Sequence, residues 1–237
     1  MPLTPDLRSL RKELERLTDN KKASFLQRFF KTGKGEYGEG DIFVGLTVPQ
    51  SRILAVKYKD LSFLEILELL KSKIHEERLI ALLILVHRFK KNPDEQKKIY
   101  NFYLQNTKYI NNWDLVDLSS HKIIGEYLLD KPKDILFELA RSENLWERRI
   151  AMISTFSFIR DRKFDTSLKI AEFLVKDKED LIQKALGWML REIGKKDLET
   201  EETFLKKYYK QMRRTALRYA IEKFPEEKRL SYLHGTV

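Results

Sequence analysis

Apolar residues recur at intervals of three and four along almost the whole chain, which is the spacing of one helix face. Only 9 Gly and 6 Pro interrupt the pattern in 237 residues. The pattern predicts an all-α protein, with helices over 5–17, 21–32, 49–58, 62–72, 75–90, 93–106, 112–130 with a break near Ser119 and Ser120, 132–141, 145–160, 165–175, 179–193, 197–209, 211–223 and 225–233.

Short polar turns separate these helices into antiparallel pairs, with a quasi-period of about 35–45 residues that is typical of HEAT-like pairs. The pair 132–141 and 145–160 resembles the pair 165–175 and 179–193, because each joins an apolar helix through an acidic turn to a helix bearing Trp and Arg. Stacked pairs predict one domain over 1–237, a curved α-solenoid whose concave surface suits an extended ligand. An irregular α-bundle is the alternative.

The segment from Gly33 to Gly45 carries five of the nine glycines and is the one break in composition. It lacks the strand–loop–helix context and the Gly-Lys-Ser/Thr ending of a phosphate-binding loop. We therefore expect a mobile connector and no nucleotide site. Pro49, whose ring fixes φ, begins the next predicted helix.

The charge balance favours a polyanionic partner. The chain has 46 Lys and Arg against 36 Asp and Glu, a formal net charge of +10. Such a charge attracts polyanions through long-range potential and counterion release, so nucleic acid is the first candidate partner. Acidic membranes and acidic proteins remain alternatives, because net charge does not choose among polyanions.

Several kinds of chemistry are excluded by composition. The absence of cysteine rules out disulfides, thiol nucleophiles and cysteine-ligated zinc. The four histidines have no metal-ligand spacing, and no serine elbow is present, so we expect neither a metal nor acyl chemistry. Residues 1–20 contain no apolar run of signal-peptide length, and no later stretch approaches the length of a membrane span. This predicts a soluble, unprocessed, cytoplasmic protein without a membrane partner.

The first candidate site residues are Trp113 and Asp117. Asn112 is a plausible N-cap, and Asp114 places an acid in the first turn, so a helix begins near Trp113. Residues four apart share one helix face, which sets an aromatic ring beside a carboxylate. The alternative is a core Trp next to a solvated Asp.

A second candidate is Arg149, in the predicted helix 145–160. Trp146 and Ile150 lie on the inward stripe, so Trp146 is assigned to the core. Arg148 falls opposite that stripe, whereas Arg149 falls at its margin. A guanidinium there could bind a phosphate or a carboxylate; the alternative is a stem packed along the core edge.

Trp188 lies at the edge of the apolar arc of the predicted helix 179–193. Lys184 and Arg191 are its neighbours one turn away, so two cations flank the indole. This combination suits stacking on sugars or bases beside phosphate contacts; a structural Trp is the alternative.

The run 206–214, which ends in Arg213 and Arg214, interleaves cations and aromatics. It is the best phosphate-binding patch by composition. A solvated helix face is an equally common use of such a run.

Taken together, the segments 112–117, 144–149 and 183–192 resemble, in order and spacing, the AlkD-like DNA alkylation-repair glycosylases. The likeness extends to 43–49 with Arg52 and to the pair at 213–214. It implies that Trp113, Asp117 and Trp188 take the catalytic places and that Arg149 takes the place of the active-site arginine. We expect DNA contacts from Lys184, Arg191, Arg213, Arg214 and Arg52.

Two departures from the family pattern accompany this resemblance. Asn112 stands where characterised members often have a second Trp, and the Gly-rich connector is longer than in compact members. Either difference could alter lesion preference or grip on the duplex. Some relatives of this fold also bind DNA without excising bases.

A single carboxylate is enough for one kind of glycosidic cleavage. Ordinary glycoside hydrolysis uses a second carboxyl to protonate the leaving group, but an N3- or N7-alkylated purine is already cationic. The resemblance therefore implies a monofunctional DNA N-glycosylase for bases such as 3-methyladenine and 7-methylguanine in duplex DNA. We also expect a monomer with no metal or cofactor. The alternatives are a non-catalytic HEAT-like binder of damaged or branched DNA, and a scaffold for an acidic protein.

Overall fold

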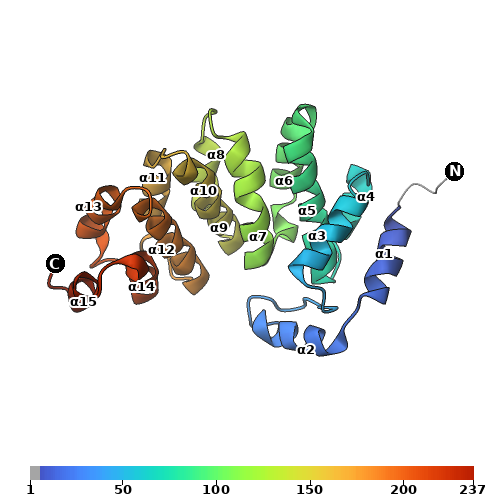
Figure 1. Ribbon diagram of the computed structural model, residues 1–237, viewed down its shortest axis with the longest axis horizontal. Coiled ribbons are helices and arrows are strands. Elements are labelled where there is room, and N and C mark those ends of the chain that lie inside the picture. Colours follow the sequence, from blue (N-terminus) through green and yellow to red (C-terminus); the bar gives the residue numbers. More distant parts are fainter. Residues whose placement is uncertain (1–5) are drawn as a thin grey trace. The chain divides into compact units, whose positions relative to one another are not determined.

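The computed structural model describes residues 6–237, which form helices joined mostly by short turns, with a longer connector over 30–47 between α2 and α3 (Figure 1). Within this range no strand is present, and the only β pairing is an isolated bridge between Ile42 and Ile74. The all-α prediction is confirmed. The predicted start of the first helix, at residue 5, lies outside the described residues.

The chain divides into two compact units, Met1–Ser119 and Ser120–Val237. Each unit has its own buried apolar core. The single continuous repeat domain stays a prediction.

Unit 1 is built around α5, whose His75–Lys91 span is buried on nearly all sides over its first three turns. The helices α3 and α4 pack against α5. Capping boxes at Thr47 and Ser62 begin α3 and α4, because each hydroxyl accepts a backbone N–H that the helix leaves unpaired. The elements of unit 1 are α1 Leu7–Arg16, α2 Asn20–Phe29, α3 Val48–Lys57, α4 Phe63–Leu70, α5 His75–Lys91, η1 Pro93–Glu95, α6 Gln96–Gln105, η2 Thr107–Tyr109 and α7 Trp113–Ser120.

Unit 2 contains the two helical pairs that the sequence predicts. The helices α8 and α9 pack on each other, as do α11 and α12, and α12 also packs on α9, α13 and α14. The predicted helix 145–160 is divided at Thr155, whose hydroxyl donates a hydrogen bond to the Met152 carbonyl. The elements of unit 2 are η3 His121–Gly125, α8 Asp134–Ala140, α9 Leu145–Ser154, α10 Phe156–Arg160, α11 Asp165–Leu174, α12 Asp180–Gly194, α13 Leu198–Tyr208, α14 Arg214–Ala220, η4 Ile221–Lys223 and α15 Glu226–His234.

The predicted break near Ser119 and Ser120 is a change of helix type. The chain continues from α7 into a π-helical turn, His121–Gly125, a geometry that often accompanies functional sites. Gly125 lets this turn approach α9, since a Cβ there would lie 2.3 Å from the Ser154 carbonyl oxygen.

A second glycine sets the spacing of α12 and α14. A Cβ on Gly187 would lie 2.3 Å from the Ala216 carbonyl oxygen and 2.5 Å from Cβ of Tyr219. The two helices therefore cross at close range, and Thr215 donates a hydrogen bond of 2.9 Å to Asp180 at the start of α12. The basic residues that begin α14 are thereby fixed to the helix that carries Trp188.

Candidate functional site

Trp113 and Asp117 lie four residues apart on α7, and both side chains are half-buried. Leu115 and Val116, between them, are fully buried and anchor the helix in unit 1. The apolar residues of α7 thus pack in the core, while its indole and carboxylate remain partly exposed to solvent. Neither Trp113 nor Asp117 belongs to the buried core.

The Trp113 indole is held by an aromatic cluster. It stacks on Phe30 at 4.9 Å between centroids, with an interplanar angle of 11°, and Phe29 approaches it edge-on at 6.0 Å. Phe30 in turn stacks on Phe43 at 4.8 Å. The indole Nε1 donates to the Tyr37 hydroxyl at 3.3 Å, so both the plane and the edge of the ring have fixed partners.

The carboxylate of Asp117 acts electrostatically on Tyr103, which is fully buried. Burial first, and then the negative charge of Asp117, raise the pKa of Tyr103 above its ordinary value. The phenol hydroxyl lies 2.9 Å from the Ser119 hydroxyl. The Tyr103 phenol therefore stays neutral at physiological pH.

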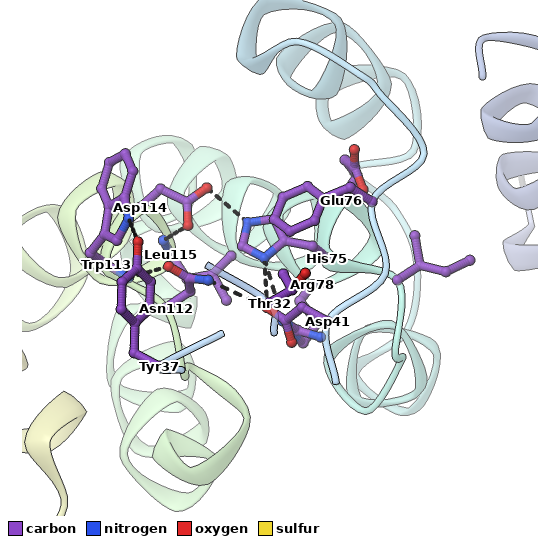
Figure 2. Close-up of polar contacts among 12 residues, drawn as sticks. Thr32, Tyr37, Asp41, His75, Glu76, Arg78, Asn112, Trp113, Asp114 and Leu115 are labelled. Carbon is purple, nitrogen blue, oxygen red and sulfur yellow. Dashed lines mark hydrogen bonds and ion pairs between the residues drawn. The ribbon is translucent and has the colours of Figure 1, made fainter. Parts of the chain in front are cut away.

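Sequence reasoning missed a buried polar cluster at the start of α7, shown in Figure 2. His75 lies with Nδ1 3.2 Å from Asp41 and Nε2 2.8 Å from Asp114. Arg78 donates to Asp41 at 2.6 Å, and the Asn112 amide donates to the same carboxylate at 3.4 Å. We call these five residues the His75 cluster; all of them are buried.

The charges of the His75 cluster support one another. Burial alone would lower the pKa of His75, but Asp114 and Asp41 together raise it to about 9. Burial likewise opposes ionisation of Asp41, yet His75 and Arg78 hold the pKa of its carboxyl below the ordinary value. At neutral pH the imidazolium therefore donates to a carboxylate from each ring nitrogen.

Glu76, adjacent to His75, fastens the Gly-rich connector. Its carboxylate accepts the backbone N–H groups of Val44, Gly45 and Leu46 at 2.9 to 3.3 Å. Gly45 adopts φ of +92°, and a Cβ there would lie 2.3 Å from the Asp19 carbonyl oxygen. The end of the connector is therefore hydrogen-bonded to a buried carboxylate, and the mobility of the remainder stays a prediction.

Arg149 and Arg148 differ in a way that the helical pattern only partly predicted. Arg149 is 5% exposed, and its guanidinium donates to the Leu181 carbonyl in the first turn of α12. Arg148 is half-buried and binds Asp177 at 2.7 Å. Both therefore tie α9 to the α11–α12 segment. Trp146 lies in the core at 7% exposure, as predicted.

Trp188 is half-buried on α12, and its polar edge faces an acid. The indole Nε1 donates to Glu192 at 3.1 Å. Of the two predicted flanking cations, Lys184 lies 2.8 Å from Asp180, and Arg191 is paired with Glu222. Each of the two cations that the sequence places beside the indole therefore has an acidic partner, on the neighbouring turn of α12 and on η4.

The remaining predicted DNA contacts are exposed. Arg52 lies on α3, and Arg213 and Arg214 lie at the start of α14, where Arg214 also donates to the Leu233 carbonyl. Trp113, Asp117 and Arg52 belong to unit 1. Arg149, Trp188, Lys184, Arg191, Arg213 and Arg214 belong to unit 2.

His121 is a second histidine that the sequence did not single out. Burial, followed by the charges of Lys122 and Arg160, lowers its pKa to about 4. Its ring meets Phe156 edge-on at 5.3 Å, and Phe156 lies 6.2 Å from Trp188. A neutral imidazole therefore adjoins the aromatic neighbour of Trp188.

In residues 6–237, no group of His, Asp and Glu side chains has the arrangement of a metal site. Among the helices described, none has both the length and the apolar character that crossing a membrane requires.

Comparison with protein-family models identifies one family. The family model described as DNA alkylation repair enzyme matches residues 10–224. No curated protein matches the sequence. The chain is similar to a solved structure, a predicted DNA alkylation repair enzyme from Enterococcus faecalis, with a TM-score of 0.68 and 18% identity; the match covers 88% of this chain and 97% of that one.

Proposed function

The chain belongs to the DNA alkylation repair enzyme family, and from this membership we propose that it is a monofunctional DNA N-glycosylase. Its proposed substrates are cationic alkylpurines of the 3-methyladenine and 7-methylguanine type in duplex DNA. The observation that carries the proposal is the half-exposed Asp117 carboxylate, one helical turn from the fixed indole of Trp113.

The chemistry requires only one carboxylate. The N-glycosidic electron pair leaves with the positively charged base, which departs neutral and needs no protonation. Positive charge then develops on the deoxyribose, where a preorganised carboxylate stabilises it. Asp117 would supply that charge and orient the water that attacks the anomeric carbon, accepting its proton.

The aromatic side chains would act on the sugar. A ring face attracts a developing cation by about 0.5–2 kcal/mol, with the larger values at desolvated sites. Trp113 is stacked on Phe30 and bonded to Tyr37, so little further ordering is required of it when substrate binds. Trp188, bonded to Glu192, is the corresponding indole of unit 2.

Basic side chains would hold the phosphates. The net charge of +10 supports a counterion-release contribution to binding. Exposed Arg52, Arg213 and Arg214 are the proposed phosphate contacts, with Lys184 and Arg191 contributing on α12. Because Arg149 is buried against Leu181, we propose that it positions the helix that carries Trp188.

The proposal is tested by Asp117→Asn. Free methylated bases are counted after incubation of methylated duplex DNA with wild type or variant, and duplex affinity is measured in parallel. We expect base release to fall by on the order of 1,000-fold with nearly unchanged affinity, because the variant loses a charge that acts on the transition state. The matched control is Asp130→Asn, whose exposed carboxylate binds Lys163. Unchanged release from Asp117→Asn would overturn the assignment.

A second candidate function is DNA binding without excision. It is favoured by Asn112, which is fully buried within the His75 cluster. The position at which the family often has a second Trp therefore offers no aromatic surface to DNA. This alternative predicts wild-type binding to methylated duplex without any free base.

A further inference from the structure

We infer that His75 is a positioning residue for the candidate site: by joining Asp41 of the connector to Asp114 of α7, it holds the Trp113 indole in its working orientation. The inference rests on the proposed function, because it assigns a role within the same site. His75 itself is 1% exposed and lies beneath the surface, so it acts only through other groups.

The composition of the His75 cluster suits fixing geometry. Two carboxylates, Asp41 and Asp114, face two cations, His75 and Arg78, so the buried charges balance. Buried ion pairs contribute little net stability, since desolvation offsets their attraction. Their directional hydrogen bonds nevertheless allow few alternative arrangements, and breaking one leaves a buried charge unpaired.

The first connection from His75 to Trp113 runs through the backbone of α7. Asp114 receives the Nε2 bond from His75 and also accepts the N–H of Leu115 at 2.8 Å. Asn112 donates to Asp41 and accepts the N–H of Trp113 at 2.8 Å. Both sequence neighbours of Trp113 are thus tied to the cluster, which fixes the direction in which its side chain leaves the helix.

The second connection runs through stacked rings. The His75 imidazole stacks on Phe43 at 4.4 Å, Phe43 stacks on Phe30, and Phe30 stacks on Trp113. A displacement of His75 would therefore reach the indole through packing as well as through hydrogen bonds.

The connector supplies the third contact. Tyr37, which accepts the indole N–H, precedes Asp41 by four residues, and Asp41 is the connector's link to His75. Glu76 holds the backbone just beyond. One turn of α5 therefore fixes both the tyrosine that meets the indole edge and the helix that carries the indole (Figure 2).

The test compares His75→Gln with His87→Gln, a half-buried histidine on the same helix outside the cluster. Three quantities are measured: the single-turnover rate of base release, the duplex Kd, and the NMR signal of the Trp113 indole N–H. We expect His75→Gln to slow release by on the order of 10- to 100-fold, because small misplacements are costly, while Kd changes less than about twofold. The indole signal should shift and exchange faster, and His87→Gln should match wild type.

A His75→Gln protein with wild-type release and a wild-type indole signal would overturn the inference. If that variant does not fold, Asp41→Asn, which keeps the side-chain shape and one acceptor oxygen, is judged by the same criteria. If wild type releases no base, the proposed function fails, while the indole signals still decide whether His75 positions Trp113. If wild type releases base, the variant decides the inference alone.

Discussion

His75 and Glu201 are buried ionisable side chains in contrasting surroundings. His75 has a carboxylate on each nitrogen, whereas Oε1 of Glu201 has no hydrogen-bond partner and the residue is 2% exposed. Burial first, and then the charge of Glu202, raise the pKa of Glu201 to about 8. The first residue keeps its charge in the interior, and the second loses its charge there.

Replacing Glu201 with Gln should remove part of the pH dependence of stability. The folded-state pKa of about 8 lies above the ordinary value of 4.5, so the folded protein retains a proton that the unfolded chain releases. The free energy of unfolding therefore falls as pH rises from about 4.5 to about 8. Urea unfolding at several pH values should give a flatter profile for Glu201→Gln than for wild type. The exposed Glu199→Gln is the control, and a variant profile as steep as that of wild type would contradict the prediction.

The imidazoles of His75 and His121 should titrate on opposite sides of neutrality. Their pKa values are about 9 and about 4, because His75 lies between carboxylates and His121 is buried beside Lys122 and Arg160. NMR titration should show His75 charged and His121 neutral at pH 7, with assignments from His→Gln variants. Protonation of His75 adds to the free energy of unfolding. This contribution is complete below about pH 6.5 and is lost as the pH rises through about 9. Titration of both rings near pH 6.5 would be inconsistent with these environments.

At the scale of elements, the structure depends on a few close approaches between helices. The crossing of α12 and α14 requires Gly187, and the approach of the π-helical turn to α9 requires Gly125. The first crossing matters most to the proposed site, because it joins the helix of Trp188 to the basic start of α14.

Gly187→Ala should therefore separate α12 from α14. The added methyl group would meet the Ala216 carbonyl oxygen at 2.3 Å, so one helix must move. We expect a loss of about 1–3 kcal/mol in the free energy of unfolding, together with weaker duplex binding. Denaturant unfolding and a binding titration measure the two effects. Thr203→Ala, on the exposed side of α13, should change neither. Wild-type stability in Gly187→Ala would argue against a close crossing.

At the scale of the whole molecule, the excess of positive charge is spread over both units, so duplex affinity should depend steeply on salt. The logarithm of the binding constant falls by about 0.9 per phosphate contact for each unit in the logarithm of salt concentration. The double substitution of Arg213 and Arg214 by Gln should reduce that slope by about two. Titrations at several salt concentrations measure it, with Lys163→Gln as control. An unchanged slope would remove α14 from the proposed interface.

The sequence by itself determined the helical class, the two helical pairs within 132–193, and the placement of Trp113 and Asp117 one turn apart. These features follow from local periodicity, because residues three and four apart share a helix face whatever the rest of the chain does. The same reasoning placed Trp146 in the core and separated Arg149 from Arg148. The family pattern, read from these segments, is consistent with the match over residues 10–224.

Only the tertiary structure decided which charges are compensated. His75 meets partners 34 and 39 residues away, Asp41 and Asp114, and no periodicity relates residues at that separation. Glu222, which pairs with Arg191 from 31 residues away, changed the surroundings of Trp188. The Glu76 carboxylate of α5 likewise accepts the Gly45 N–H at the end of the Gly-rich connector, a contact that the glycine content does not predict. A buried charge without a partner is costly, so buried charges lie beside opposite charges that the fold brings close in space. Spacing along the chain does not reveal these partners.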